Sequence, residues 1–236
     1  MTSLIKPKLG TDSETGWKFY ALHLSSSYII NEFFLVSNYK RCIKNSRSTG
    51  SKELSKWAVK MDEQEYHDLY VHSFIGMWSS FESGLVNIVA DFIKNDRQVA
   101  INLSSKFKTG RFDVEAWPWN SETCLDLAQR IESKAKHDVE NGGVDFFSRI
   151  QKLFSWLNIS INVGEHEKLY LSEANRVRNI LLHRYGVISE KDAREFSCLL
   201  PWVGSVMPLT KDKFTNYYNG ISQTLISIMT GIASST

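Results

Sequence analysis

Cysteine and proline are scarce in this sequence, and both shortages restrict what the chain can form. Its 236 residues include three cysteines and four prolines. Cys42, Cys124 and Cys198 are odd in number, widely separated and without a Cys-x-x-Cys or Cys/His pattern, which argues against a disulfide framework and a structural zinc site. With so few prolines, long helical stretches can run without interruption.

Long apolar runs and a strong charge of either sign are also lacking. The most apolar late run, 225–233, is far shorter than a bilayer requires, and residues 1–7 contain no apolar signal region. We therefore expect a cytoplasmic protein with no membrane partner. The net charge of +2 is too small for a general nucleic-acid coat, so contact with RNA or DNA would require a local basic patch.

Apolar residues recur at helical spacing along most of the chain, which predicts an all-α bundle of about six helices. These helices are expected at about 17–44, 62–92, 122–137, 147–157, around 170–185, and from 211 onward. Asp62 and Glu65 have the layout of a capping box for the second helix, and Thr210 can cap the last. We interpret 1–236 as one domain, with a core at about 62–234 preceded by a helix and loop at 1–61.

The remaining segments lose the helical period. Residues 45–52 are polar and predict a loop, and 97–120 contain Trp117-Pro118-Trp119, which cannot be an uninterrupted helix. Two short runs around Gly204, 198–202 and 205–208, predict at most a short β-hairpin before the last helix. Ser189 and Asp192 form another candidate capping pair.

The densest group of chemically capable side chains lies at 176–186. On an ideal helix, at about 100° per residue, an apolar stripe is formed by Tyr170, Ala174, Val177 and Leu181. The opposite side carries Asn175, Arg176, Arg178, Asn179 and His183. This face carries no carboxylate to neutralise these cations, so it suits an anion such as a phosphodiester. Gly186 is well placed to end the helix.

The run 178–186, Arg-Asn-Ile-Leu-Leu-His-Arg-Tyr-Gly, resembles the HEPN domains of prokaryotic ribonucleases, whose signature is an arginine, a polar residue and then a histidine. The layout from about 62 to 234 is similar as well, including the phrase at 78–85, while the first 60 residues are not covered. The nearest similarity is to HEPN proteins of the RiboL-PSP-associated type and their relatives in toxin and phage-defence systems.

This resemblance implies a metal-independent endoribonuclease that cuts single-stranded or loop RNA by 2′-hydroxyl attack, as a toxin or antiviral defence effector. His183 would take the proton of a ribose 2′-hydroxyl or return one to the leaving 5′-oxygen, because the charge of an imidazole changes near neutral pH. Arg178 would hold the scissile phosphate and stabilise its transition state. Asn179 would orient the phosphate or His183.

Arg178 and His183 lie about 140° apart on an ideal helix, so both cannot point straight at one phosphate. Either the long arginine reaches round, or the helix deforms before Gly186, or the phosphate lies between two copies of the motif in a two-fold dimer. The resemblance favours a homodimer joined through the motif helix, in which one histidine acts as base and its symmetry mate as acid.

Several further residues are candidates for supporting roles. Glu82 lies in an apolar stretch and is a candidate to orient Arg178 or His183, or else a rim residue of its helix. Tyr185 either stacks a base, receives an adenylyl group from a partner nucleotidyltransferase as the resemblance implies, or simply packs. Support at the site is also expected from Arg176 and Arg184, and RNA contact from Lys106, Lys108 and Arg111.

We expect no metal and no cofactor. His67 and His72 are five residues apart, unlike the four-residue spacing of helical zinc pairs. The expected partners are RNA, a second copy of the chain, and an antitoxin or sensor protein. Two alternatives stay open: a non-catalytic HEPN-type module that binds RNA, a nucleotide or a protein, and an assembly subunit whose basic helix contacts an acidic partner.

Overall fold

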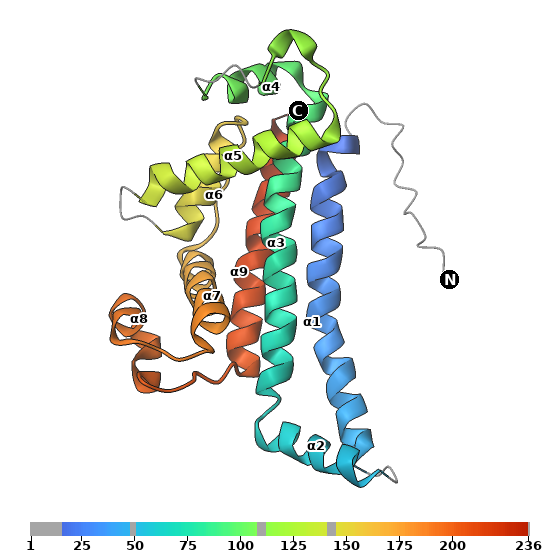
Figure 1. Cartoon of the computed structure of the whole chain (residues 1–236), viewed down its shortest axis with the longest axis vertical. Coiled ribbons are helices and arrows are strands. Elements are labelled where there is room, and N and C mark those ends of the chain that lie inside the picture. Colours follow the sequence, from blue (N-terminus) through green and yellow to red (C-terminus); the bar gives the residue numbers. More distant parts are fainter. Residues whose placement is uncertain (1–15, 48–50, 108–111, 141–144, 236) are drawn as a thin grey trace. The chain divides into compact units, whose positions relative to one another are not determined.

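A computed structural model describes residues 16–47, 51–107, 112–140 and 145–235. Within these ranges the chain is helical and forms no strand, which confirms the all-α class (Figure 1). The α-helices are α1 (Tyr20–Ser46), α2 (Lys52–Glu63), α3 (His67–Asn95), α4 (Arg97–Ser104), α5 (Ser121–Glu140), α6 (Phe146–Ser155), α7 (Glu165–Arg184), α8 (Glu190–Glu195) and α9 (Lys211–Ser234). Short 3-10 helices lie at η1 (Gly16–Phe19), η2 (Val114–Ala116) and η3 (Ser197–Trp202). No helix in these ranges combines the length and hydropathy needed to cross a bilayer.

The six helices expected from apolar periodicity correspond to α1, α3, α5, α6, α7 and α9. The described ranges also contain three shorter helices, α2, α4 and α8, of 12, 8 and 6 residues. Few turns give a weak periodic signal, which explains why α2 and α4 were not expected. Their starts are nevertheless capped, because Ser51 and Asp96 accept hydrogen bonds from backbone N–H groups three residues ahead.

The predicted capping box at Asp62 and Glu65 is wrong. Asp62 lies in the last turn of α2, and α3 begins only at His67. Between them, Glu65 and Tyr66 adopt left-handed backbone conformations, with φ of 49° and 64°. The Asp62 carboxylate instead accepts a hydrogen bond from the Tyr66 hydroxyl (2.7 Å) and pairs with Arg47. It therefore holds the turn that separates the two helices.

The chain divides into two compact units, which are described separately. The first unit comprises Met1–Ser25, Glu82–Ile161 and Ser227–Thr236, and the second comprises Ser26–Phe81 and Asn162–Ile226. The helices α1, α3 and α9 each contribute a segment to both units. The prediction of a single domain stays a prediction.

In the first unit, α5 and α6 pack together and bury the apolar faces predicted from their spacing. Fully buried side chains include Leu127, Ile131, Phe147, Ile150 and Phe154. Trp117 ties the non-periodic segment to α3, whereas Trp119 makes a hydrogen bond within the segment. Trp117 Nε1 donates to the Ile93 carbonyl (3.1 Å), and Trp119 Nε1 donates to the Asp113 carbonyl (2.8 Å).

Asp91, on α3 in the first unit, is a partly buried carboxylate that the sequence did not single out. Burial raises its pKa to about 6, although the charge of Lys94 and a hydrogen bond from the Ala21 backbone act in the opposite direction. Because the pKa of Asp91 is raised in the folded state, the contribution of this carboxyl group to the free energy of unfolding is fully present at low pH. It is lost as the pH rises from about 4 through about 6.

Replacing Asp91 with asparagine is expected to remove this loss. At pH 8 the free energy of unfolding should rise by about 1 kcal/mol, since the partly exposed position lets water screen part of the penalty. At pH 4, where the native carboxyl group is protonated, wild type and Asp91→Asn should match. Urea unfolding at both pH values measures this difference, and an equal difference at pH 4 and pH 8 would contradict it.

The second unit has an aromatic core formed by α1, α3 and α9. The Phe33 ring stacks on Phe214 and Tyr218, with centroids 5.6 Å and 3.9 Å apart, and Phe74 packs on the buried Tyr217 at 5.2 Å. His67, whose spacing from His72 does not fit a helical zinc pair, accepts a hydrogen bond at Nδ1 from the Leu209 backbone N–H (2.8 Å). Its burial lowers its pKa, against the influence of Asp68.

The two runs that were predicted to form a hairpin do not pair with each other. Residues 198–202 form the helix η3, while Val203 and Val206 form isolated bridges with Ile188 and Val187, the residues that follow the motif. The Ile188 N–H donates to the Ser205 carbonyl (3.0 Å), and the Gly204 N–H donates to the Ile188 carbonyl (2.9 Å). Gly204 turns the chain at a φ of 79°, as its position suggested. These bonds brace the segment directly after α7.

Candidate functional site

The helix α7 carries the motif and is packed into the second unit along one side. Its buried side chains include Leu171, Ala174, Val177 and Ile180, which recur at helical spacing. Only Ala174 and Val177 of the predicted stripe are buried, because the buried face is rotated toward Leu171 and Ile180. A Cβ added at Gly220 of α9 would lie 3.1 Å from the Leu171 backbone nitrogen, so this glycine permits the two helices to approach closely.

The end of α7 is regular. Tyr185 and Gly186 follow the last helical residue with φ of 53° and 82°, and both of their N–H groups donate to the Ile180 carbonyl. Gly186 therefore lies just beyond the helix, as predicted, although Tyr185 is the first left-handed residue. Because α7 runs without a break to Arg184, deformation before Gly186 does not bring Arg178 and His183 onto one side.

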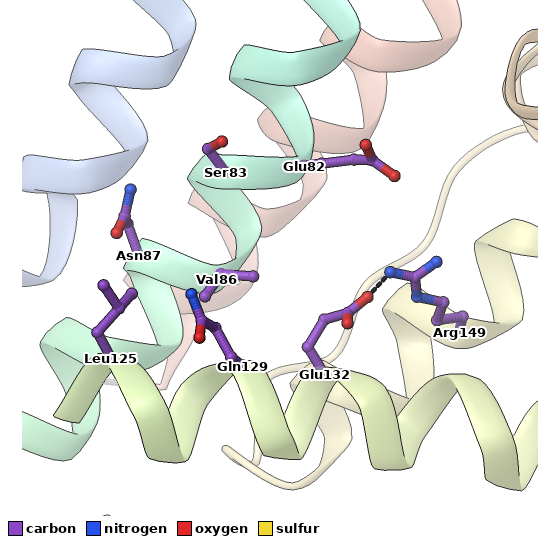
Figure 2. Close-up of a pocket in the computed structure, with 8 residues that line it drawn as sticks. All are labelled: Glu82, Ser83, Val86, Asn87, Leu125, Gln129, Glu132 and Arg149. Atoms are coloured by element: carbon purple, nitrogen blue, oxygen red, sulfur yellow. Dashed lines mark ion pairs between the residues drawn. The ribbon is translucent and has the colours of Figure 1, made fainter. Parts of the chain in front are cut away.

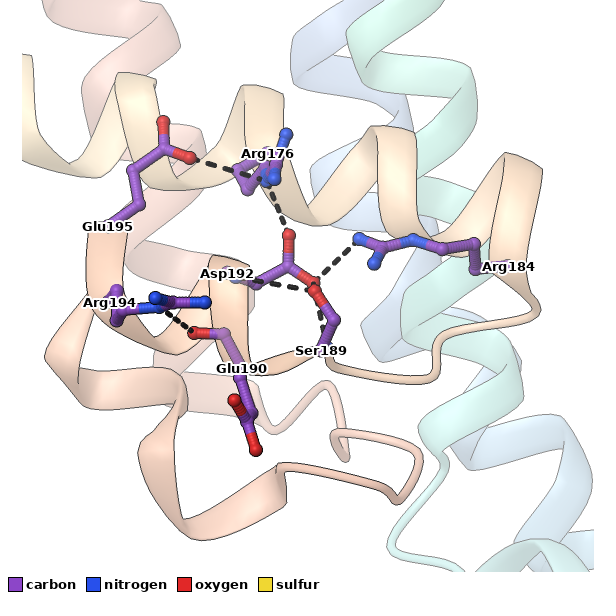
Figure 3. Close-up of polar contacts among 7 residues, drawn as sticks. All are labelled: Arg176, Arg184, Ser189, Glu190, Asp192, Arg194 and Glu195. Carbon is purple, nitrogen blue, oxygen red and sulfur yellow. Dashed lines mark hydrogen bonds and ion pairs between the residues drawn. The ribbon is translucent and has the colours of Figure 1, made fainter.

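A carboxylate from α8 neutralises two of the motif arginines, which corrects the expectation of an acid-free face. Asp192 is completely buried and accepts from Arg176 Nε at Oδ1 (2.6 Å) and from Arg184 Nη2 at Oδ2 (2.7 Å) (Figure 3). Arg176 also lies 3.6 Å from the Glu195 carboxylate. The helical pattern of α7 could not reveal this, because Asp192 follows Arg176 by 16 residues.

Asp192 also completes the predicted capping pair at the start of α8. It accepts from the Ser189 backbone N–H (2.8 Å) and hydroxyl (2.7 Å), while Ser189 Oγ accepts from the Asp192 N–H (3.4 Å). Burial acts to raise the pKa of Asp192, but the Ser189 and Arg184 hydrogen bonds and the charge of Arg176 outweigh it. The pKa is lowered to about 2, so the carboxylate is charged at neutral pH.

The three residues predicted to be catalytic lie outside this network. Arg178 Nη1 donates to Asn179 Oδ1 (2.9 Å), which orders the two neighbouring side chains together. His183 is exposed, and no hydrogen bond or ion pair engages it within the described part of the chain. Tyr185 is 91% exposed. The helix end thus presents an accessible imidazole and an ordered guanidinium–amide pair.

Exposed apolar side chains lie on the last turn of α7 and on the segments that follow it. Leu182 and Leu200 are 48% and 65% exposed, and Val187, Val203 and Val206 are also exposed. All five belong to the second unit. An accumulation of exposed apolar residues beside polar ones is typical of protein interaction surfaces.

A second polar cluster beneath α7 was not found from the sequence. Glu173, 8% exposed, pairs with Lys213 of α9 and accepts a hydrogen bond from the buried Tyr217 hydroxyl (2.7 Å). Burial, then the Glu173 charge, raises the pKa of Tyr217 well above its ordinary value. These contacts hold α7 against α9. No sequence pattern connects Glu173 with Lys213 and Tyr217, because they are about 40 residues apart.

Glu82 belongs to the first unit, whereas Arg178 and His183 belong to the second. It lines a cavity of about 460 Å³ together with the Glu132–Arg149 ion pair (Figure 2). Its orienting role at the motif stays a prediction. Of the residues expected to contact RNA, Lys106 lies in the first unit, and Lys108 and Arg111 fall outside the described residues.

The described ranges contain no group of three or more histidine, cysteine, aspartate or glutamate side chains arranged to hold a metal ion. Comparison of the chain with models of known protein families, with curated proteins and with solved structures finds no match.

Proposed function

We propose that this chain is a metal-independent endoribonuclease of the HEPN type, and that it cleaves single-stranded or loop RNA. The observation that carries the proposal is the accessible, unengaged imidazole of His183 at the end of α7, on the helix that also carries the ordered Arg178–Asn179 pair. A toxin or an antiviral defence effector is the biological role that fits such an activity.

In the proposed reaction, His183 takes the proton from a ribose 2′-hydroxyl, and the 2′-oxygen attacks the adjacent phosphorus. The bond from phosphorus to the 5′-oxygen breaks, and that oxygen receives a proton from a second imidazolium. The products are a 2′,3′-cyclic phosphate and a 5′-hydroxyl. Arg178 stabilises the charge that develops on the phosphoryl oxygens, with Asn179 holding its guanidinium in place.

The proposed active form is a homodimer joined around α7. On a regular helix Arg178 and His183 remain about 140° apart, so one chain does not direct both at a single phosphate. A two-fold axis beside the helix end would supply the missing group from the second copy. The exposed Leu182 and Leu200 would be buried in such an interface. An antitoxin or sensor protein is a further proposed partner, and the 91% exposed Tyr185 is accessible to it.

The structure changes the roles proposed for two supporting arginines. Because Arg176 and Arg184 bind Asp192, we assign them to holding α8 against the end of α7. Their neutralisation removes two cations from the proposed catalytic face, and a second candidate function is a non-catalytic module that binds RNA, a nucleotide or a protein. Tight RNA binding by wild type without any cleavage, under conditions in which a related nuclease cuts, would support this candidate over the first.

The proposed chemistry is tested with a short single-stranded RNA in EDTA. Wild-type protein is expected to cleave it, since no step requires a metal ion. A matched RNA with one 2′-deoxy nucleotide at the mapped cleavage position should resist cutting at that position only, because the nucleophile is missing there. Denaturing gel electrophoresis separates the products. Loss of cleavage in EDTA, or continued cutting at the 2′-deoxy position, would contradict the mechanism.

A further inference from the structure

The helix α5 in the first unit is bordered by three adjoining hollows, all of which are lined by Gln129. One hollow, about 820 Å³, lies toward the end of α4, and another, about 460 Å³, lies toward α3 and α6. The third, about 440 Å³, lies toward the start of α5. Leu125 lines two of the hollows, Asp126 lines another two, and Gln129 lines all three, and we name this set of neighbouring hollows the α5 groove.

One end of the α5 groove is basic. Lys106, Arg130 and Lys134 line the 820 Å³ hollow, together with the single carboxylate of Asp126 and with His137. Asp126 accepts from Arg130 Nε at both oxygens (3.1 Å each), and Asp138 lies 3.5 Å from Lys134 Nζ. Three cations and one carboxylate therefore line the hollow, and a second carboxylate, that of Asp138, pairs with Lys134 beside it.

Lys106, which lines this hollow, also contacts the ring of Trp156, which does not line it. Lys106 Nζ lies 4.7 Å from the centre of the Trp156 ring, and Lys152 Nζ lies 5.6 Å from it. Among the described residues no carboxylate pairs with either lysine. Cation–π contacts leave the positive charge unneutralised. Cations beside a partly exposed aromatic ring are the combination by which proteins hold single-stranded nucleic acid.

The other end of the α5 groove is lined by groups that both donate and accept hydrogen bonds. Figure 2 shows Asn87 of α3 and Gln129 of α5 on one side of this hollow, while the carboxylate of Glu82 points toward the side where Glu132 of α5 pairs with Arg149 of α6. An amide side chain presents a carbonyl oxygen and an NH₂ group side by side, which matches the edge of a nucleobase. The basic end of the groove therefore suits a phosphate, and the end lined by amide side chains suits a base.

We propose that the α5 groove binds single-stranded RNA, with phosphates at Lys106, Arg130 and Lys134 and a base near Gln129. The inference deepens the proposed ribonuclease function by naming a surface that holds the substrate, and it rests on that function for the choice of RNA. Binding and cleavage are nevertheless separable, because the residues changed in the test, Lys106, Gln129 and Lys134, have no proposed role in the reaction.

The test measures binding without cleavage. The full chain carrying His183→Ala is titrated against a fluorescently labelled single-stranded RNA, and anisotropy is followed at several salt concentrations. Adding Lys106→Glu and Lys134→Glu is expected to weaken binding by about tenfold or more, and to reduce the slope of log affinity against log salt by about 1.4, since two phosphate contacts are lost. Gln129→Ala should change the preference among homopolymer RNAs.

The control is Lys136→Glu, which makes the same charge change on α5 as Lys134→Glu alone, at an exposed residue that does not line the groove. It should bind RNA like the parent, and thermal unfolding verifies that each variant is folded. The proposal would be overturned if the double variant bound RNA as tightly as the parent, or if the control lost as much RNA affinity as the double variant. It would also be overturned if a poly-glutamate peptide bound as tightly as the RNA. If wild type binds RNA through the groove but never cuts it, the ribonuclease proposal fails while this one stands.

Discussion

Replacing His183 with alanine is expected to lower the rate of RNA cleavage by a factor of about 10²–10⁴, the range over which one positioned acid–base group acts. The side chain is exposed at the end of α7 and takes no part in the Asp192 network, so the fold should be unaffected. The free energy of unfolding should change by less than about 0.5 kcal/mol. Initial rates on a labelled single-stranded RNA, together with urea unfolding, measure both quantities.

The matched control is His166→Ala, which removes an exposed imidazole from the opposite end of the same helix. It should cleave RNA at the wild-type rate. The dimer is tested by adding an excess of His183→Ala to wild type, because a hybrid dimer keeps only one of the two imidazoles that the proposed reaction uses. Activity below that of wild type alone is expected. Equal loss in His166→Ala and His183→Ala would remove the assigned role of His183.

Replacing Asp192 with asparagine is expected to lower the free energy of unfolding by about 3 kcal/mol at neutral pH, because two guanidinium groups lose their buried counter-charge. An amide still accepts hydrogen bonds but carries no charge for Arg176 or Arg184. The turn from α7 to α8, which Asp192 holds through Ser189, should loosen at the same time. Urea unfolding at pH 7 measures the loss, and cleavage assays show whether an ordered helix end is required.

The pH dependence separates this effect from simple loss of packing. The pKa of Asp192 is lowered to about 2 in the folded chain, so its contribution is present above the unfolded pKa and is lost as the pH falls toward 2. The difference between wild type and Asp192→Asn should therefore shrink in acid. Asp212→Asn changes an exposed aspartate in the first turn of α9 and should shift the unfolding free energy by less than about 0.5 kcal/mol. A pH-independent difference for Asp192→Asn would contradict the charge-based account.

The long helices could be predicted because their apolar residues recur within a single element. Phe147, Ile150 and Phe154 are buried on α6 as their spacing indicates, and Ala174 and Val177 are buried on α7. Helix caps could also be predicted, because the groups that interact in a cap are close together in the sequence. The Ser189–Asp192 pair caps α8, and Thr210 Oγ1 accepts from the Lys213 N–H (3.3 Å) at the start of α9.

Contacts between distant residues could not be predicted in the same way. The spacing within α7 gave no reason to expect that Asp192 would reach Arg176 and Arg184, or that Glu173 would meet Lys213 and Tyr217. The pairing of Val206 with Val187, in place of a local hairpin, has the same cause. Such contacts are set by tertiary packing, which overrides what short segments favour.

The correction at Asp192 narrows the candidate site. The sequence suggested a broad cationic face, whereas the structure leaves Arg178, Asn179 and His183 as the motif side chains outside the α7–α8 network. These three are also the residues first assigned to catalysis, and Arg176 and Arg184 acquire a structural explanation. The proposed reaction therefore rests on fewer residues and is easier to test.

Analysis of the cleavage ends tests the proposed ribonuclease activity most directly. Purified wild type and the Arg178→Ala/His183→Ala double variant are incubated in EDTA with a defined single-stranded RNA, and the 3′ ends of the fragments are identified by mass spectrometry. We predict 2′,3′-cyclic phosphate ends with wild type and intact RNA with the double variant. Intact RNA with both proteins, or equal cleavage by both, would contradict the account.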